Sequence, residues 1–197
     1  ISMEDDATAQ FTTEPMLAAA DLLADAQVQA ICWNGTSSGW LGFGADRALI
    51  AGIEARTGVP ACSCVLGIND ILARLGARRV AFVTPYLPEI QDAICANYRA
   101  EGFEVAAERH LDDPGNFSFA TYDADIVAGM CRAVAAEAPD AIAVFCTNFR
   151  GAGVAAAIEA ETGVPVIDSV SAALWASMRT AGADPSRVRG WGRVFDV

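Results

Sequence analysis

One eight-residue segment occurs twice in this chain. Ile53-Glu-Ala-Arg-Thr-Gly-Val-Pro60 returns as Ile158-Glu-Ala-Glu-Thr-Gly-Val-Pro165, offset by 105 residues. Each copy predicts the end of a helix, a glycine that stops it and a proline that leads into a strand. Each also follows, one helix earlier, an apolar strand that ends in small and hydroxyl-bearing residues. We therefore expect two related β-loop-α units within one chain.

The regions around the two copies alternate between short β-branched runs and amphipathic helical patterns. This alternation is typical of α/β proteins. Strands are predicted at residues 28–33, 61–65, 79–84, 103–109, 141–146 and 164–167. Helices are predicted at residues 13–26, 46–57, 68–75, 88–101, 123–138, 151–162 and 169–181.

The composition is that of a globular protein, with 53% apolar and 19% charged residues. No segment reaches the roughly 18 apolar residues of a membrane span. The first residues, Ile-Ser-Met-Glu-Asp-Asp, show no export signal. We expect a soluble, unexported, cytoplasmic protein without a membrane partner. The net charge of −12 repels phosphate backbones, which argues against nucleic acid.

Six cysteines and one histidine bear on metal chemistry. Most of the cysteines lie in strand or helix patterns and are expected to be core thiols. Cys62-Ser-Cys64 is not a CxxC pair, and alternation along a strand would point both thiols the same way. His110, the only histidine, is expected on the solvent side at a strand end. Neither a metal site nor a Ser-His-Asp triad is predicted.

Two loops that follow predicted strands carry polar groups. Ligands of parallel sheets bind beyond the carboxyl ends of the strands, so both loops are expected at the binding site. In the first loop, Gly35, Thr36 and Ser37 offer N–H groups and hydroxyls to an oxyanion, although a plain polar turn has the same composition. In the second loop, Cys146 precedes a predicted helix whose N-terminus favours the thiolate. The alternative for Cys146 is a buried structural thiol.

Three further positions have both a functional and a structural interpretation. Tyr86 follows a strand directly and can donate a hydrogen bond to a carboxylate, or it packs on Pro85. Asn116 can present its amide to a carboxylate, but Pro-Gly-Asn is also a turn signal. Trp191-Gly-Arg193 can cover the site or cap the sheet, and packing is expected.

Several of these motifs together resemble the aspartate/glutamate racemase superfamily, in the branch of arylmalonate decarboxylases and maleate cis-trans isomerases. The resemblance runs nearly end to end. It depends on Gly35-Thr-Ser, Gly58-Val-Pro60, Gly76-Ala-Arg-Arg-Val80, Thr84-Pro-Tyr86, Cys146, Gly163-Val-Pro165 and Gly190-Trp-Gly-Arg-Val-Phe-Asp196.

The resemblance implies two pseudo-duplicated Rossmann-like parallel-sheet halves with the active site between them, and no metal or organic cofactor. The first half would comprise residues 1–76 and 185–197, and the second residues 77–184. Chains of this family begin with a strand and a polar loop that contact substrate, and nothing resembling them precedes Ser2, so the first half is expected to lack its first strand. The implied partner is a small carboxylate or dicarboxylate. Members are often oligomers, which leaves a homo-oligomer open.

The family also implies roles for individual residues. Racemases and isomerases generally use two cysteines, one on each loop, whereas the decarboxylases keep only the second and have Gly-Thr-Ser at the first. This chain has Gly35 at the first position and Cys146 at the second. The resemblance thus implies a decarboxylase in which Thr36, Ser37 and Tyr86 hold an enediolate while Cys146 protonates one face.

Other residues favour a more polar substrate. Thr147 and Asn148 follow Cys146 where the decarboxylases resemble Gly-Gly, and Asn116 matches an asparagine that maleate isomerases use on a carboxylate. Racemisation or cis-trans isomerisation of a small dicarboxylate therefore stays open. Cys32, three residues before Gly35, is a poor substitute for the missing thiol. A third alternative is a non-catalytic carboxylate-binding protein that kept the cleft.

Overall fold

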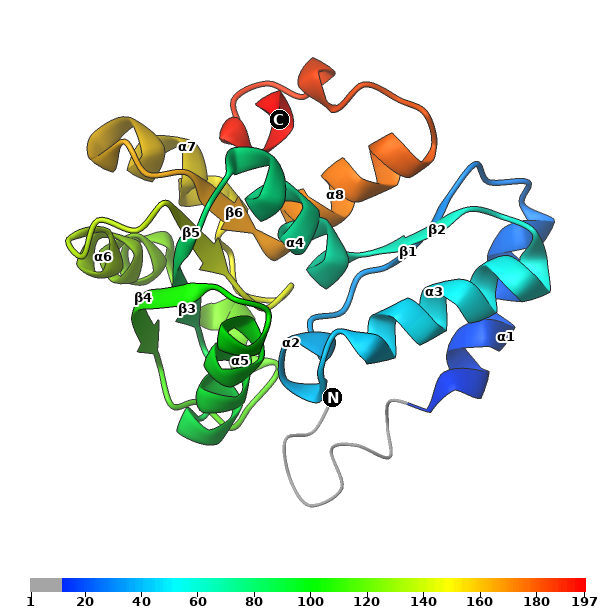
Figure 1. Cartoon of the computed structure of the whole chain (residues 1–197), viewed down its shortest axis with the longest axis horizontal. Helices are drawn as coiled ribbons and strands as arrows, with labels where there is room; N and C mark the ends of the chain where they lie inside the picture. Colours follow the sequence, from blue (N-terminus) through cyan, green and yellow to red (C-terminus); the bar gives the residue numbers. More distant parts are fainter. Residues whose placement is uncertain (1–11) are drawn as a thin grey trace.

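The computed structural model describes residues 12–197, and their strands form two parallel sheets. One sheet pairs β1 with β2, and the other has the order β4-β3-β5-β6 (Figure 1). The strands are β1 (Ile31–Trp33), β2 (Ala61–Ser63), β3 (Arg79–Thr84), β4 (Glu104–His110), β5 (Ala141–Val144) and β6 (Val166–Asp168). Each predicted strand is present, and the predicted α/β fold is confirmed.

Helices cover both sheets and join them. They are α1 (Thr13–Asp25), α2 (Ser38–Leu41), α3 (Gly44–Thr57), α4 (Cys64–Leu75), α5 (Pro88–Ala100), α6 (Ala124–Ala135), α7 (Ala152–Thr162) and α8 (Ser169–Thr180). Short 3-10 helices are η2 (Ser118–Thr121), η3 (Pro185–Arg187) and η4 (Arg193–Asp196). In Figure 1, α1 and α3 lie with the smaller sheet, while α6 and α7 pack on the larger one. Helix α8 packs along α4 and contacts β1, β2 and β6, so it connects the two sheets.

The two strands at the centre of the larger sheet explain where the core lies. Every residue of β5 is buried, and so are all residues of β3 after Arg79. Such continuous apolar strands are typical of parallel sheets covered on both faces. The predicted boundaries of the two halves stay a prediction, and residues 1–11 of the first half lie outside the described part of the chain.

The repeated segment makes the same contacts in both copies. The threonine hydroxyl donates to the carbonyl four residues earlier at 2.7 Å, and the next residue but one donates its N–H back to that hydroxyl. The glycine takes a left-handed conformation, with φ of 71° and 76°. The glutamate accepts the N–H seven residues later, at 3.0 and 2.8 Å. The matched residues are Glu54 and Glu159, Thr57 and Thr162, and Gly58 and Gly163. The repeat is therefore a helix-to-strand connection that was used twice.

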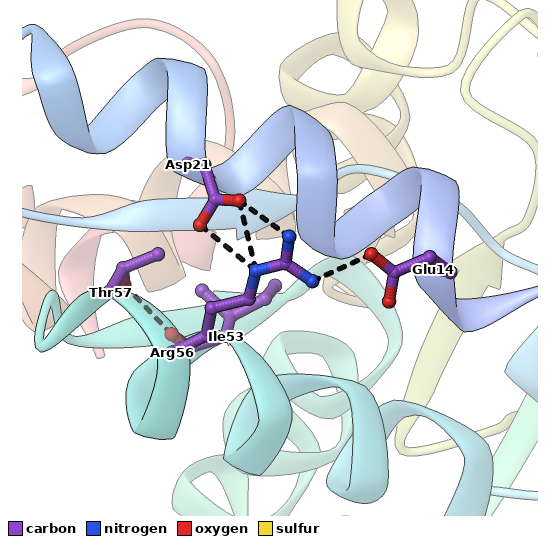
Figure 2. A network of polar contacts seen from close by, with 5 residues as sticks. All are labelled: Glu14, Asp21, Ile53, Arg56 and Thr57. Carbon is purple, nitrogen blue, oxygen red and sulfur yellow. Dashed lines mark hydrogen bonds and ion pairs between the residues drawn. The ribbon is translucent and has the colours of Figure 1, made fainter.

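One difference between the copies reverses a surface charge. Arg56 binds Asp21 at 2.7 Å and Glu14 at 2.8 Å, both on α1 (Figure 2). The second copy has Glu161 at the matched place, and it binds Arg132 of α6 at 2.9 Å. Each residue pairs with the helix that packs beside it, although exposed ion pairs of this kind contribute little to stability.

One predicted strand end and one predicted helix start are wrong, and both errors arise from a cap at Ser63: the helix predicted at 68–75 begins at Cys64. The predicted strand 61–65 ends at Ser63, because the Ser63 hydroxyl accepts the Leu66 N–H at 3.2 Å and starts α4. Cys64 therefore lies in a helix, and the strand-alternation argument for Cys62 and Cys64 does not hold. Helix α2 was not predicted. Among the helices of residues 12–197, none is long and apolar enough to cross a membrane.

Candidate active site

A pocket of about 90 Å³ lies where the carboxyl ends of β1, β3 and β5 converge. This is the edge at which ligands of parallel sheets bind. The β4–η2 connection completes the wall. The lining residues are Trp33, Asn34, Gly35, Thr36, Ser37, Trp40, Tyr86, Asn116, Phe119, Cys146 and Thr147.

Seven of the eight residues predicted for the site line this pocket. The eighth, Asn148, lies exposed beside it, and its amide donates to the carbonyl and the Oδ1 of Asn116 at 3.2 and 2.9 Å. The Asn116 turn is thus held against the loop that carries Cys146. The roles of these residues stay a prediction.

The remaining candidates lie elsewhere. His110 binds Glu108 at 2.8 Å outside the pocket. Cys32 directs its sulfur to the carbonyl of Ala173 at 3.9 Å, so it does not replace the missing thiol. Arg193 binds the end of α7 through its backbone N–H and Glu159 at 2.9 Å.

Sequence reasoning missed four of the lining residues: Trp33, Asn34, Trp40 and Phe119. Trp33 and Asn34 did carry a signal, because Trp33 ends the predicted strand 28–33 and Asn34 connects it to the Gly35 loop. Trp40 and Phe119 did not, since each reaches the pocket through a ring contact with Tyr86, at centroid distances of 5.3 and 5.6 Å.

Cys146 has an unusual backbone conformation. Its φ of 105° lies in the region that favours glycine, yet the residue carries a side chain. The Phe149 N–H donates to the Cys146 carbonyl at 3.0 Å and closes a tight turn directly after β5. A residue in such a conformation costs about 1–3 kcal/mol and persists only where its surroundings hold it, often at functional sites.

The surroundings of Cys146 favour the neutral thiol. Burial raises its pKa above the ordinary 9.0, and only 5% of the residue is exposed. The Tyr86 hydroxyl and the N–H groups of Asn148 and Phe149 lower the pKa by less. The expectation that a helix N-terminus would favour the thiolate is therefore wrong, because α7 begins only at Ala152 and burial dominates. A protonated thiol in a closed pocket is suited to donating a proton.

Beside this thiol lies a pair of buried hydroxyls. Thr36 Oγ1 and the Tyr86 hydroxyl are 2.8 Å apart, although Thr36 follows β1 of one sheet and Tyr86 follows β3 of the other. Burial, followed by the nearby Cys146, raises the pKa of Tyr86, so the phenol stays protonated. Two protonated hydroxyls next to a proton donor can stabilise a developing oxyanion.

On the Gly35 loop, the Trp33 indole occupies the space next to the glycine. A Cβ added to Gly35 would lie 2.6 Å from Cε2 of Trp33 and closer still to its Cζ2. Real Cβ atoms do not approach other atoms this closely, so any side chain here requires the indole to move. The loop therefore presents backbone and hydroxyl groups in place of a second thiol.

Comparison with known proteins assigns this chain and its fold to a family. The arylmalonate decarboxylase family model matches residues 2–195. Arylmalonate decarboxylase of Bordetella bronchiseptica is 29% identical over 165 residues, which are 82% of this chain and 69% of the relative. A liganded arylmalonate decarboxylase variant with Gly-to-Cys and Cys-to-Ser substitutions has a TM-score of 0.87 at 26% identity, covering 93% of this chain and 80% of that one.

A second group of relatives isomerises maleate. A Cys-to-Ala variant of the maleate isomerase of Pseudomonas putida S16, solved with maleate, has a TM-score of 0.84 at 26% identity and covers 91% of this chain and 74% of that one. These matches confirm the predicted resemblance to the branch that holds both activities. The chain belongs to the arylmalonate decarboxylase family.

Proposed function

We propose that this protein is a cofactor-free decarboxylase of a substituted malonate or similar small carboxylate. One observation carries the proposal. Among the described residues that line the pocket, Cys146 supplies the one thiol, and the matching loop supplies Gly35 under the Trp33 indole. A single proton donor on one loop suits protonation of one face of an intermediate. Removal and return of a proton on opposite faces would need a second group.

The hydroxyl pair defines where the carboxylate binds. In the free site, Thr36 and Tyr86 hydrogen-bond to each other, and a substrate carboxylate can accept from both. The bond from the α-carbon to the second carboxylate then breaks, carbon dioxide leaves, and the electron pair enters the bound carboxylate as an enediolate. Donors aimed at this developing charge lower the barrier.

Cys146 completes the reaction. Its thiol donates the proton to the α-carbon, the enediolate returns to a carboxylate, and the thiolate regains a proton from water. Because the proton comes from one side, the product of a prochiral malonate is a single enantiomer. The raised pKa of Cys146 keeps the donor protonated at neutral pH.

The shape of the pocket indicates the substituent. Trp33, Trp40, Phe119 and Tyr86 form an aromatic wall, which suits an apolar group on the α-carbon. The space of about 90 Å³ favours a compact substrate. We therefore propose a malonate that carries a small apolar substituent.

The test is turnover of a series of substituted malonates in deuterated water, with released carbon dioxide and product chirality as readouts. Cys146→Ala should reduce turnover by about 10²- to 10⁴-fold, the usual contribution of a positioned acid, while affinity for the product persists. Cys131→Ala, which removes a buried thiol of α6, is the matched control and should retain turnover. Absence of carbon dioxide from every malonate would contradict the proposal. Unchanged turnover in Cys146→Ala would contradict the role of the thiol, and binding without turnover of any substrate would indicate a carboxylate-binding protein.

Cis-trans isomerisation of a small dicarboxylate is the second candidate, favoured by the polar side of the pocket. Asn116 and Thr147 line it, and Asn148 fixes Asn116. The two reactions need opposite forms of Cys146, since a thiolate adds to an alkene whereas a thiol protonates an enediolate. Because the pKa of Cys146 is raised, decarboxylation should persist through neutral pH and fall only in the alkaline range where Cys146 ionises, and isomerisation of maleate should rise over that alkaline range.

A further inference from the structure

A second pocket, of about 410 Å³, lies away from the candidate active site, between β2, α3, α4 and α8. Cys62 forms part of its wall. The proposed reaction uses neither this pocket nor its thiol. Most other thiols of residues 12–197 are closed in the core, as Cys64 and Cys131 show with no measurable exposure.

Cys62 has a partner thiol on the neighbouring strand. Cys32 of β1 and Cys62 of β2 are in direct register, so their side chains leave the same face of the sheet. Neighbouring strands lie about 4.8 Å apart, within the Cα separation of roughly 4.4–6.8 Å that a disulfide spans. Both sulfurs face one turn of α8. Cys32 Sγ lies 3.9 Å from the Ala173 carbonyl, and Cys62 Sγ lies 3.9 Å from the Ser177 hydroxyl.

The contact between the two thiols shifts their pKa values in opposite directions. The hydrogen bond from Cys32 lowers the pKa of Cys62, and the hydroxyls of Thr180 and Ser177 lower it further. The same contact raises the pKa of Cys32. Oxidants react with thiolates and reach them only where there is access. Cys62, which is 9% exposed in the wall of this pocket, therefore has a lowered pKa despite its burial, while burial raises the pKa of Cys146.

We propose that Cys62 is a peroxide-reactive thiol and that Cys32 resolves its oxidised form as a disulfide across β1 and β2. The Cys62 thiolate attacks the terminal oxygen of a hydroperoxide and the O–O bond breaks. The leaving hydroxide or alkoxide takes a proton from the solvent and departs as water or an alcohol, and the product is a sulfenic acid. The Cys32 thiol then attacks the sulfenic sulfur, the S–O bond breaks, and the hydroxyl leaves as water with the thiol proton as the S–S bond forms. Two thiols are oxidised and one hydroperoxide is reduced.

The experiment treats the full chain with a small molar excess of hydrogen peroxide, blocks free thiols with N-ethylmaleimide, and maps tryptic peptides by mass spectrometry without reduction. We expect a linked pair of peptides containing Cys32 and Cys62 that dithiothreitol separates. Cys62 and Cys64 share one tryptic peptide, since the chain has basic residues at Arg56 and Arg74 but none between. Cys64→Ala is therefore the matched control and should retain the link, whereas Cys62→Ser should abolish it.

A second variant tests the order of the steps. In Cys32→Ser the sulfenic acid on Cys62 has no resolving thiol, so dimedone should label Cys62 in this variant more than in the unsubstituted chain. The proposal is overturned by an unsubstituted chain that forms no linked peptide, by a link that survives in Cys62→Ser, or by dimedone labelling that does not increase in Cys32→Ser.

Discussion

The two loops that meet at the pocket depart from ordinary backbone preference in opposite directions. Gly35 has a φ that side chains adopt readily, but the Trp33 indole leaves no room for a Cβ. Cys146 has a φ of 105°, where a glycine would be unstrained, and yet it keeps its thiol. Backbone conformation alone would favour a residue with a side chain at position 35 and a glycine at position 146. The chemical groups that the two loops present therefore explain the residue types at positions 35 and 146 better than backbone φ preference does.

This contrast suggests a division of labour between the two loops, in which one binds the substrate and the other donates the proton. The Gly35 loop offers Thr36, whose hydroxyl meets Tyr86 at 2.8 Å, and it is the binding side. The Cys146 loop offers the protonated thiol and is the proton-donating side. The same kind of substitution in each loop can show whether the division is real.

Removing one hydroxyl from each loop should give the largest effect. Thr36→Val deletes a buried donor next to the expected oxyanion, and we expect kcat/KM for the malonate to fall by about 10²- to 10³-fold. Thr147→Val makes the same change beside Cys146, where the side chain is half-buried at the pocket rim, and it should cost less than about tenfold because no catalytic hydrogen bond is lost. Steady-state kinetics of both variants provide the measurement. Equal losses would contradict the division of labour.

The sequence predicts the elements that surround this site and part of the site itself. The strand ends and the two loops follow from apolar runs that stop at Gly35 and Cys146, and the structure brings both loops to one pocket. The repeated segment predicts two related units, because both copies need the same glycine and threonine at the same turn. These features depend on local patterns, which a sequence displays directly.

Features that depend on three-dimensional burial could not be predicted. Because Cys146 precedes a predicted helix, the sequence suggested a thiolate with a lowered pKa. Burial of the thiol raises its pKa instead. Phe119 lines the pocket because its ring packs on Tyr86, more than thirty positions away in sequence, and no local pattern indicates this contact. The Trp33 ring above Gly35 likewise becomes visible only when the side chains are placed.

A buried carboxylate lies next to each loop, and the two come from different elements. Asp168 is the last residue of β6, caps α8 by accepting the Val170 and Ser171 N–H groups at 2.9 and 3.0 Å, and lies beside Gly151. Asp46 lies in the first turn of α3, near the Ser38 hydroxyl. Burial raises the pKa of both, in the case of Asp168 to about 6.

Asp168→Asn should remove a pH-dependent part of the stability while keeping the helix cap. Between pH 3.8 and about 6 the folded carboxyl stays protonated while the unfolded one ionises, so its contribution is complete below pH 3.8 and is lost as the pH rises to about 6. The shift corresponds to roughly 3 kcal/mol. Urea unfolding of both proteins should show the variant gaining stability relative to the unsubstituted chain from pH 4 to about pH 6. From about pH 6 to pH 7 the difference in free energy of unfolding should stay constant. A difference that does not vary with pH would contradict the shift.

Filling the space at Gly35 tests the other loop. Gly35→Ala should cost about 1–3 kcal/mol, because the new methyl group displaces the Trp33 indole from a packed position. Gly44→Ala is the matched control, since a Cβ there meets no atom within 4 Å. Replacing Trp33 by Leu in the Gly35→Ala background should recover part of the loss. Denaturant unfolding of the single and double variants measures this coupling, and purely additive effects would show that the indole does not exclude the side chain.

The smallest expected effect concerns the strain at Cys146. Cys146→Gly and Cys146→Ala both remove the thiol, but only glycine is unstrained at a φ of 105°. We expect the glycine variant to be more stable than the alanine variant by about 1 kcal/mol, the strain relief reduced by the greater entropy of the unfolded glycine chain. Both should lose turnover to the same extent, so the comparison separates backbone strain from chemistry. An alanine variant as stable as the glycine variant would mean that the loop relaxes around a side chain, and that its φ is not imposed by the fold.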